Sequence, residues 1–286
     1  MKKLRLSAGI DVGGSKILGV LYDAQKQKTY AVKKQPIDKT TLTSFIKQLT
    51  TEINRLQEAC LKISGQNLTE IGIGIPGLIK NNRVINCPNL QILNDQLLGR
   101  KLTTATGLKK IILDNDLNCF LRTYLKKHSE YRRGSLIVLA LGTGIGGSIA
   151  LNGKNIINQP GISSEIGHSI INPETGQDLE HYYHELIGQP ASHLFAVAEK
   201  NQSAQIKIEK FAKILAATTA NLNNIFNPTA FILTGGVSKY YKYYLPTVKK
   251  LTKQASFTKN QPVWRIGHDQ KAAAIGACLL IEALDN

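Results

Sequence analysis

The sequence predicts an α/β protein built of two lobes of like topology, each with a mixed β-sheet. Three observations predict this class: the length of 286 residues, the alternation of strand-like and helix-like segments, and a repeat of the opening pattern. Because a single hydrophobic core rarely grows past roughly 250–300 residues, two lobes are the better expectation. Strands that alternate with helices are typical of α/β folds.

The repeat joins residues 9–23, GIDVGGSKILGVLYD, to residues 139–153, LALGTGIGGSIALNG, about 130 residues later. In both stretches an apolar strand leads into a glycine turn with a hydroxyl residue, and a second apolar strand ends in a polar turn. We therefore expect one strand–turn–strand unit of this kind in each lobe.

The remaining elements alternate in a similar way in the two halves. Apolar periodicity and strand-like runs predict, in chain order, a helix near 41–61, strands at 70–77 and 109–113, a long helix around 205–226, a strand at 230–236 and a last helix near 271–283.

No linker rich in Pro, Gly or Ser divides the halves, so we place the hinge just after Asp116. The expected domains are a small first lobe, 1–116, joined by the C-terminal helix 271–286, and a larger second lobe, 117–270.

The composition is that of a soluble chain, with 42% hydrophobic and 20% charged residues. No apolar run reaches the roughly 20 residues of a membrane span, since residues 135–151 are broken by four glycines. The N-terminal run ends at Asp11, short of the roughly 7–15 apolar residues of an export signal. We expect a cytoplasmic protein without a membrane partner, whose dispersed cysteines are reduced, partly buried thiols: Cys60, Cys87, Cys119 and Cys278.

A formal charge of +16 raises the question of a nucleic-acid partner. The basic residues come as scattered pairs and form neither a dense tract nor an aromatic-interleaved motif. A solvated lysine-rich surface is therefore favoured, and no nucleic acid is expected as a partner. The summed field would still attract small anions such as nucleotides.

The clustering of glycines at the two turns requires an explanation. GTGIGG, residues 142–147, satisfies the dinucleotide pattern G-x-G-x-x-G, but a strand and not a helix follows it, so the Rossmann context fails. Glycines lack the Cβ that keeps main-chain N–H groups away from phosphate oxygens. One such hairpin alone is more often a structural turn, whereas a matched pair with an acidic residue before the first favours phosphate binding.

This pair of hairpins resembles the sugar kinase, Hsp70 and actin superfamily, and nearly the whole chain is similar to the ROK family of repressors, open reading frames and kinases. The resemblance implies two ribonuclease-H-like lobes, the actin-like ATPase fold, with a cleft between them. It rests on motifs in the family's order: DVGGSK (11–16), GIPGLI (74–79), CPNL (87–90), DNDLN (114–118), LGTGIGG (141–147), EIGH (165–168) and LTGGV (233–237).

The resemblance implies ATP and Mg²⁺ as cofactors. Asp11 is expected to hold the Mg²⁺ through water, and further residues are expected to contact the nucleotide: Gly13, Gly14, Ser15, Lys16, Gly142, Thr143, Gly144, Gly235 and Gly236.

A hydroxyl that attacks ATP needs a carboxylate to orient it and take its proton. The resemblance implies that Asp116 is this catalytic carboxylate, and its place after a predicted strand and before a helix agrees with that. Its alternative role is a helix N-cap. The resemblance assigns the sugar to Asp116 and to six further residues: Gly77, Asn89, Asn115, Glu165, His168 and Glu180. Glu165 and His168 alone would be an ordinary surface pair, and Glu180 could instead be a helical residue paired with His184.

The chain departs from many ROK proteins, which bind zinc through cysteines after the E-x-G-H motif. Residues 171–183, INPETGQDLEHYY, contain no cysteine, so no zinc site is expected and packing alone should shape this loop. His181 and His184 have a permissible ligand spacing but no clear further ligand.

The resemblance implies ATP-dependent phosphorylation of a free hexose, at the C6 hydroxyl, by a homo-oligomer, a dimer. Glucose is the first candidate, and N-acetylmannosamine, N-acetylglucosamine and fructose are alternatives. A repressor would carry a helix-turn-helix before the DxGG motif, and only ten residues precede Asp11. A non-catalytic sugar-sensing protein is the remaining alternative.

Overall fold

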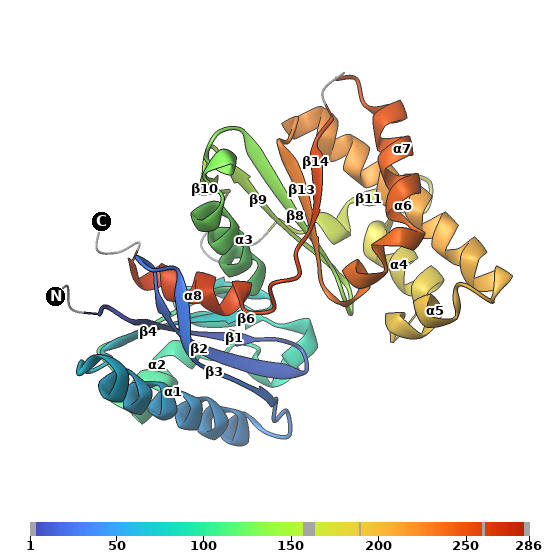
Figure 1. The fold of residues 1–286 in the computed structure, drawn as a ribbon. Coiled ribbons are helices and arrows are strands. Elements are labelled where there is room, and N and C mark those ends of the chain that lie inside the picture. Colours follow the sequence, from blue (N-terminus) through green and yellow to red (C-terminus); the bar gives the residue numbers. More distant parts are fainter. Residues whose placement is uncertain (1–3, 157–163, 189, 259–260, 283–286) are drawn as a thin grey trace. The chain divides into compact units, whose positions relative to one another are not determined.

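The computed structural model describes residues 4–156, 164–188, 190–258 and 261–282 (Figure 1). The chain divides into two compact units, broken after His128 and again at Asp269, where the C-terminal segment returns to the first unit. Helix α3 (Asp116–Lys127), which begins where the sequence places the hinge, belongs to the first unit in this division. The lobe boundary itself stays a prediction.

In the described part of the first unit, five strands form one sheet in the order β3-β2-β1-β4-β7. β1, β2 and β3 are antiparallel neighbours, whereas β1, β4 and β7 run parallel. The strands are β1 (Ser7–Val12), β2 (Lys16–Asp23), β3 (Lys28–Pro36), β4 (Glu70–Ile75) and β7 (Lys110–Asn115), with a separate hairpin of β5 (Leu78–Lys80) and β6 (Arg83–Asn86).

Helices cover both faces of this sheet. Figure 1 shows α1 (Leu42–Ser64) and α2 (Leu98–Thr106) on one face, and α3 and α8 (Ala272–Glu282) on the other. A short 3₁₀ helix, η1 (Pro88–Leu93), follows β6. Helix α1 buries an apolar stripe at helical spacing: Phe45, Leu49, Ile53, Leu56 and Cys60.

Helix α8 lies directly on β1 and β4. A Cβ at Gly9 would overlap the carbonyl oxygen of Ala274, and a Cβ at Gly72 would overlap that of Ala277. These glycines therefore allow a close approach of backbones. The contact fixes the two strands whose carboxyl ends carry the candidate site.

The second unit repeats the design of the first. Its five described strands have the order β10-β9-β8-β13-β14, again with two antiparallel pairs followed by two parallel pairs. The expectation of two lobes of like topology is confirmed. The strands are β8 (Ser135–Leu141), β9 (Ile145–Leu151), β10 (Lys154–Asn155), β13 (Ala230–Thr234) and β14 (Val263–Ile266).

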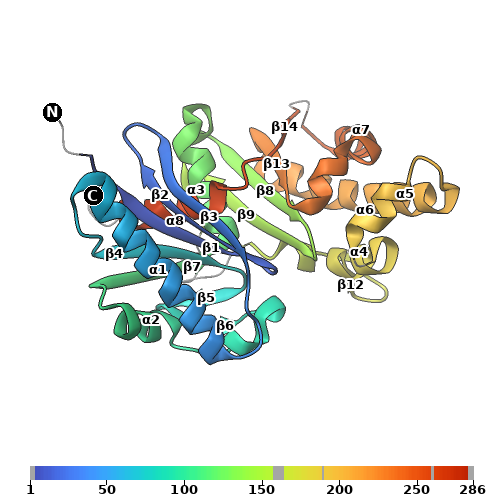
Figure 2. The same ribbon diagram turned by 60° about the horizontal axis from the view of Figure 1, so that its bottom comes forward.

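The larger helices of this unit, α4 to α7, gather on one side of its sheet (Figure 2). Phe211 on α6 and Phe231 on β13 are fully buried in the core between these helices and the sheet. The elements are α4 (Leu179–Ile187), α5 (Ala191–Val197), α6 (Gln202–Phe226) and α7 (Leu245–Ala255), the 3₁₀ helices η2 (Ser129–Arg132), η3 (Ile166–His168) and η4 (Gly236–Tyr243), and a small pair, β11 (Ile170–Asn172) and β12 (Gln177–Asp178).

Each predicted helix and strand occurs, with shifts of a few residues at the ends. The four cysteines are free and fully buried, where the sequence led us to expect partly buried thiols. No helix within the described ranges is long and apolar enough to cross a bilayer.

We expect Thr41→Ala to cost about 1 kcal/mol of stability. The Thr41 hydroxyl accepts the N–H of Ser44 at 3.0 Å, while the Ser44 hydroxyl accepts the N–H of Thr41 at 3.2 Å, a reciprocal cap at the start of α1. Thermal unfolding checks this, with Thr41→Ser as the control that keeps the cap. Equal melting temperatures for the two variants would contradict it.

Candidate active site

In the first unit, the carboxyl ends of three parallel strands lie side by side. Asp11 on β1 is opposite Gly74 on β4, and Gly74 is opposite Asp114 on β7. A Cβ at Gly74 would lie 3.3 Å from the Cα of Asp116. Asp11 and Asp116 therefore flank the end of β4, at the edge where ligands bind in open α/β sheets.

The two carboxylates influence each other. Burial, and secondly the Asp116 carboxylate, raise the pKa of Asp11 to about 8 against the opposing effect of the Lys34 ammonium. Two neighbouring carboxylates form a donor set that suits a hard cation such as Mg²⁺, which binds one or two carboxylates together with phosphates and water. In the described ranges, no three His, Cys, Asp or Glu side chains gather into a metal-binding group.

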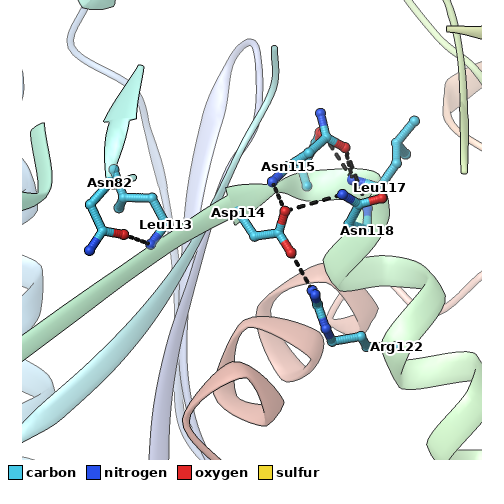
Figure 3. A network of polar contacts seen from close by, with 8 residues as sticks. Asn82, Leu113, Asp114, Asn115, Leu117, Asn118 and Arg122 are labelled. Carbon is cyan, nitrogen blue, oxygen red and sulfur yellow. Dashed lines mark hydrogen bonds and ion pairs between the residues drawn. The ribbon is translucent and has the colours of Figure 1, made fainter. Parts of the chain in front are cut away.

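Asp114 anchors the junction between β7 and α3 (Figure 3). Its Oδ1 accepts the Asn115 N–H at 2.7 Å and the Asn118 side-chain amide at 3.1 Å, and its Oδ2 lies 2.5 Å from Arg122. Ionic and amide partners thus compensate the buried charge. The network fixes the backbone that carries Asn115 and Asp116.

Asn115 is the N-cap of α3. Its Oδ1 accepts the N–H of Leu117 at 2.9 Å and that of Asn118 at 3.4 Å, and its Nδ2 donates to the Gly77 carbonyl at 3.0 Å. The side chain therefore ties the GIPG loop to the helix. Its expected contact with a sugar hydroxyl stays a prediction.

Asp116 is the first residue of α3 and does not take the capping role that the sequence leaves open for it. Its Oδ1 accepts the N–H of the adjacent Leu117 at 3.0 Å. The partly exposed carboxylate stands at the strand-end edge, a suitable place for the expected proton acceptor.

The first glycine turn is closed by the Gly13 N–H, which donates to the Lys16 carbonyl at 2.8 Å. Ser15 and Lys16 are exposed, as is Asn89 on η1. Gly77 has a left-handed φ of 104°. The expected contacts of these residues with ATP or sugar stay predictions.

Helix α4 holds the second glycine turn from both sides. The Tyr183 hydroxyl donates to the Gly142 carbonyl at 2.5 Å, and Glu180 Oε2 accepts the Ile145 N–H at 3.0 Å. The exposed Thr143 lies between them in sequence. Two side chains of one helix thus fix the turn that is expected to contact phosphate.

Gly235 and Gly236 follow β13 next to the same turn. β13 pairs with β8 up to Thr234 opposite Ala140, and a Cβ at Gly235 would overlap the Leu141 carbonyl oxygen. The structure therefore brings the two predicted nucleotide segments of this unit together.

Three glycines stand apart from the others whose surroundings are described. A Cβ added at Gly14, Gly142 or Gly236 would have no neighbouring atom within 4 Å, and the backbones of these residues are not left-handed. Neither packing nor backbone conformation requires glycine there. All three lie in segments that the sequence assigns to the nucleotide.

The E-x-G-H segment packs on β9, because a Cβ at Gly167 would overlap the Ile145 carbonyl oxygen. Glu165 and His168 are both exposed. His168 Nδ1 lies 2.8 Å from Asp178 Oδ2, and Asp178 Oδ1 accepts the His181 N–H at 2.8 Å as the N-cap of α4. The expectation that packing alone shapes this loop is therefore wrong.

The Glu180 side chain makes more contacts than the sequence predicts. Its Oε1 lies 3.3 Å from His184 Nε2, the helical pairing left open above. The same carboxylate would overlap a Cβ at Gly144 and would lie 2.8 Å from one at Gly167. It thus links the second glycine turn to the E-x-G-H segment, and its sugar contact stays a prediction.

Sequence motifs do not single out Asp178, Tyr183 or Arg122. Asp178 has a detectable signal, since an aspartate before an amphipathic run is an N-cap pattern. The partners of Tyr183 and Arg122 depend on tertiary contacts, which no local pattern shows.

Two sheets of the same strand order, each opening in a glycine hairpin, define the fold of the actin-like ATPases. Residues 7–283 match the ROK family, and the chain belongs to that family.

Three similar proteins illustrate this kinship. The N-acetyl-D-glucosamine kinase of Haemophilus influenzae is 24% identical over 304 residues, covering 95% of this chain and 98% of the relative. The glucokinase of Thermotoga maritima is 28% identical over 276 residues, with 84% of each chain covered. The crystal structure of a ROK family glucokinase from Streptomyces griseus, in complex with glucose and AMPPNP, has a TM-score of 0.77 at 21% identity and covers 96% of this chain and 99% of its own.

Proposed function

We propose that this sugar kinase transfers the γ-phosphoryl group of ATP to the C6 hydroxyl of a free hexose. Its curated relatives, named as N-acetyl-D-glucosamine kinases and a glucokinase, support the class of reaction. Glucose is the first candidate substrate and N-acetylglucosamine the second. A homodimer is the expected assembly.

The observation that carries the ATP assignment is the set of glycines without a structural reason. Gly14, Gly142 and Gly236 are open at the Cβ position and lie at or beside turns. The N–H groups of Gly13 and Gly142 close the two hairpin turns, and other main-chain N–H groups there can donate to phosphate oxygens. A side chain there would hold phosphate away from the backbone. The first turn with Ser15 and Lys16, and the second with Thr143, would form the nucleotide contacts.

The chemistry needs few covalent steps from the protein. The hexose hydroxyl oxygen attacks the γ-phosphorus, the bond to the β–γ bridging oxygen breaks, ADP leaves, and the hydroxyl proton passes to the Asp116 carboxylate. Mg²⁺, held through water by Asp11, would neutralise charge on the phosphates. Asp114 and Arg122 keep the backbone of Asp116 in place.

The polar groups expected to hold the hexose are those of Asn89, the GIPG loop with Gly77, Glu165, His168 and Glu180. Carboxylate and imidazole together accept and donate hydrogen bonds, which suits vicinal hydroxyls.

A coupled ADP-release assay with ATP, Mg²⁺ and a panel of glucose, N-acetylglucosamine, N-acetylmannosamine and fructose tests the proposal. We expect ADP release that depends on the sugar. Sugar binding by calorimetry without such release would contradict it and favour a sugar-sensing protein.

We expect free glucose to be preferred over methyl β-glucoside by at least about tenfold in kcat/KM, a ratio that needs only about 1.4 kcal/mol. We propose that Glu165, His168 and Glu180 contact the reducing end of the hexose, where a substituent on O1 would leave their polar groups unpaired. We expect His168→Ala to reduce this preference, mainly by lowering kcat/KM for the free sugar. Equal kcat/KM values for glucose and methyl β-glucoside in the parent enzyme would contradict the assignment of these residues to the reducing end.

A further inference from the structure

We infer that Asp178 is a positioning residue for His168. Its carboxylate keeps the proton of the imidazole on Nδ1 and so reserves Nε2 for a sugar hydroxyl. The inference deepens the proposed function and rests on it for the sugar contact of His168. The contact between the two side chains stands independently of that function.

The geometry of the pair is set by backbone on both sides. His168 ends η3, and Asp178 ends β12, ten residues later. Ile170 pairs with Asp178 between β11 and β12, and the Leu179 N–H donates to the Ser169 carbonyl at 3.0 Å. The paired backbone thus brings the two residues together, and His168 Nδ1 lies 2.8 Å from Asp178 Oδ2.

The Asp178 carboxylate is also anchored. Its second oxygen, Oδ1, accepts the His181 N–H at 2.8 Å and caps α4. With one oxygen on the helix end, the other is directed to the ring of His168. An N-cap is therefore used here to orient a neighbouring side chain as well as to start a helix.

The chemistry of the partners selects one tautomer. An ionised carboxylate only accepts hydrogen bonds, so the neutral imidazole must donate through Nδ1–H. Its Nε2 is then the acceptor, and in the imidazolium form Nε2–H becomes a donor. If Asp178 were absent, this interaction would no longer determine which ring nitrogen of His168 carries the proton.

Stability does not explain the contact. The side chain of His168 is 63% exposed and that of Asp178 23%, and pairs as exposed as this one contribute little to folding. We therefore expect the contact between Asp178 and His168 to affect the tautomer of the His168 ring and the binding of sugar.

The charges around the ring give the sign of a pH effect. The hydrogen bond from Asp178 raises the pKa of His168, burial acts against it, and Glu180 and Glu165 also raise it. Strand β9, which packs against η3, carries no titratable side chain. Loss of Asp178 should lower the pKa of His168, so the ring would become neutral at a lower pH.

Two variants of Asp178 separate its roles. Asp178→Ser keeps an N-cap but removes the partner of Nδ1. Asp178→Asn can keep the cap through its single oxygen and then offers an N–H to Nδ1, which favours the tautomer with the proton on Nε2. Thr175→Ala, in the same loop, is the matched control, because the Thr175 hydroxyl bonds to Gln177 and not to His168. Melting temperatures check that each variant folds.

The first measurement is ¹⁵N NMR of the ring nitrogens in the sugar-free protein, with His168→Ala to assign the signals. We expect a protonated Nδ1 in the neutral ring of the parent and of Thr175→Ala, a lowered pKa in Asp178→Ser, and a proton on Nε2 in Asp178→Asn. A parent-like tautomer and titration in both Asp178 variants would overturn the inference.

The second measurement is the KM for sugar and for ATP. We expect Asp178→Ser to raise the KM for sugar roughly two- to twelvefold, the worth of one hydrogen bond, and to leave the KM for ATP unchanged. A changed ring with an unchanged KM for sugar would also overturn the inference. Absence of sugar-dependent ADP release in the parent contradicts the proposed function instead, and the NMR titration still decides the contact between Asp178 and His168.

Discussion

Asp116→Asn lowers kcat for sugar phosphorylation by about 10²–10⁴-fold while sugar affinity stays within a few-fold of the parent; this is the largest effect that we expect. The amide keeps the shape and most hydrogen bonds of the carboxylate but cannot take the hydroxyl proton. Asn115 caps α3 independently of residue 116, so the substitution should leave the helix intact.

Steady-state kinetics and calorimetry of sugar binding check this expectation. Asp95→Asn is the matched control, since Asp95 is an exposed aspartate that pairs with Arg83 in the same unit. Turnover of Asp116→Asn near the parent rate would remove Asp116 from the catalytic role. A loss of sugar affinity as large as the loss of kcat would make it a binding residue instead.

The sheet and its hairpins could be predicted from sequence because their signals are local. The apolar runs around Gly13 and Gly144 and the alternation of strands with helices follow from patterns of a few residues. The repeat of the glycine turn then implied two lobes of like topology, and the two sheets have the same strand order.

The junction at α3 shows where such prediction stops. In DNDLN both Asn115 and Asp116 suit an N-cap, and sequence alone does not choose between them. The choice depends on Gly77, whose carbonyl accepts the Asn115 amide across 38 residues, and on Asp114, which fixes the preceding peptide. The contact with Gly77 joins residues far apart in the chain, so no local pattern shows it.

The loop before α4 illustrates a second limit. The sequence shows that this loop has no cysteine, but it does not show which contacts hold the loop in place. Asp178 reaches His168 because β11 and β12 pair, and neither strand exceeds three residues. Strands this short have little periodicity from which they could be predicted.

Gly14→Ala and Gly142→Ala should raise the KM for ATP by about 10–150-fold, the worth of one hydrogen bond to a charged phosphate. A phosphate oxygen approaches a main-chain N–H to about 2.7–3.2 Å, and a new methyl group at the turn obstructs that approach. The fold should not suffer, because both Cβ positions are open and neither backbone is left-handed. Alanine can even stabilise such positions by about 0.4–1 kcal/mol through the unfolded state.

Gly72→Ala supplies the contrast, since its Cβ would overlap the Ala277 carbonyl oxygen and should lower the melting temperature. Melting temperatures and the KM for ATP of the three variants, measured side by side, separate damage to the fold from damage to the nucleotide site. If Gly14→Ala and Gly142→Ala keep the parent's KM, phosphate does not approach these turns. The two hairpins would then be structural turns, and the assignment of ATP to residues 11–16 and 142–144 would fall.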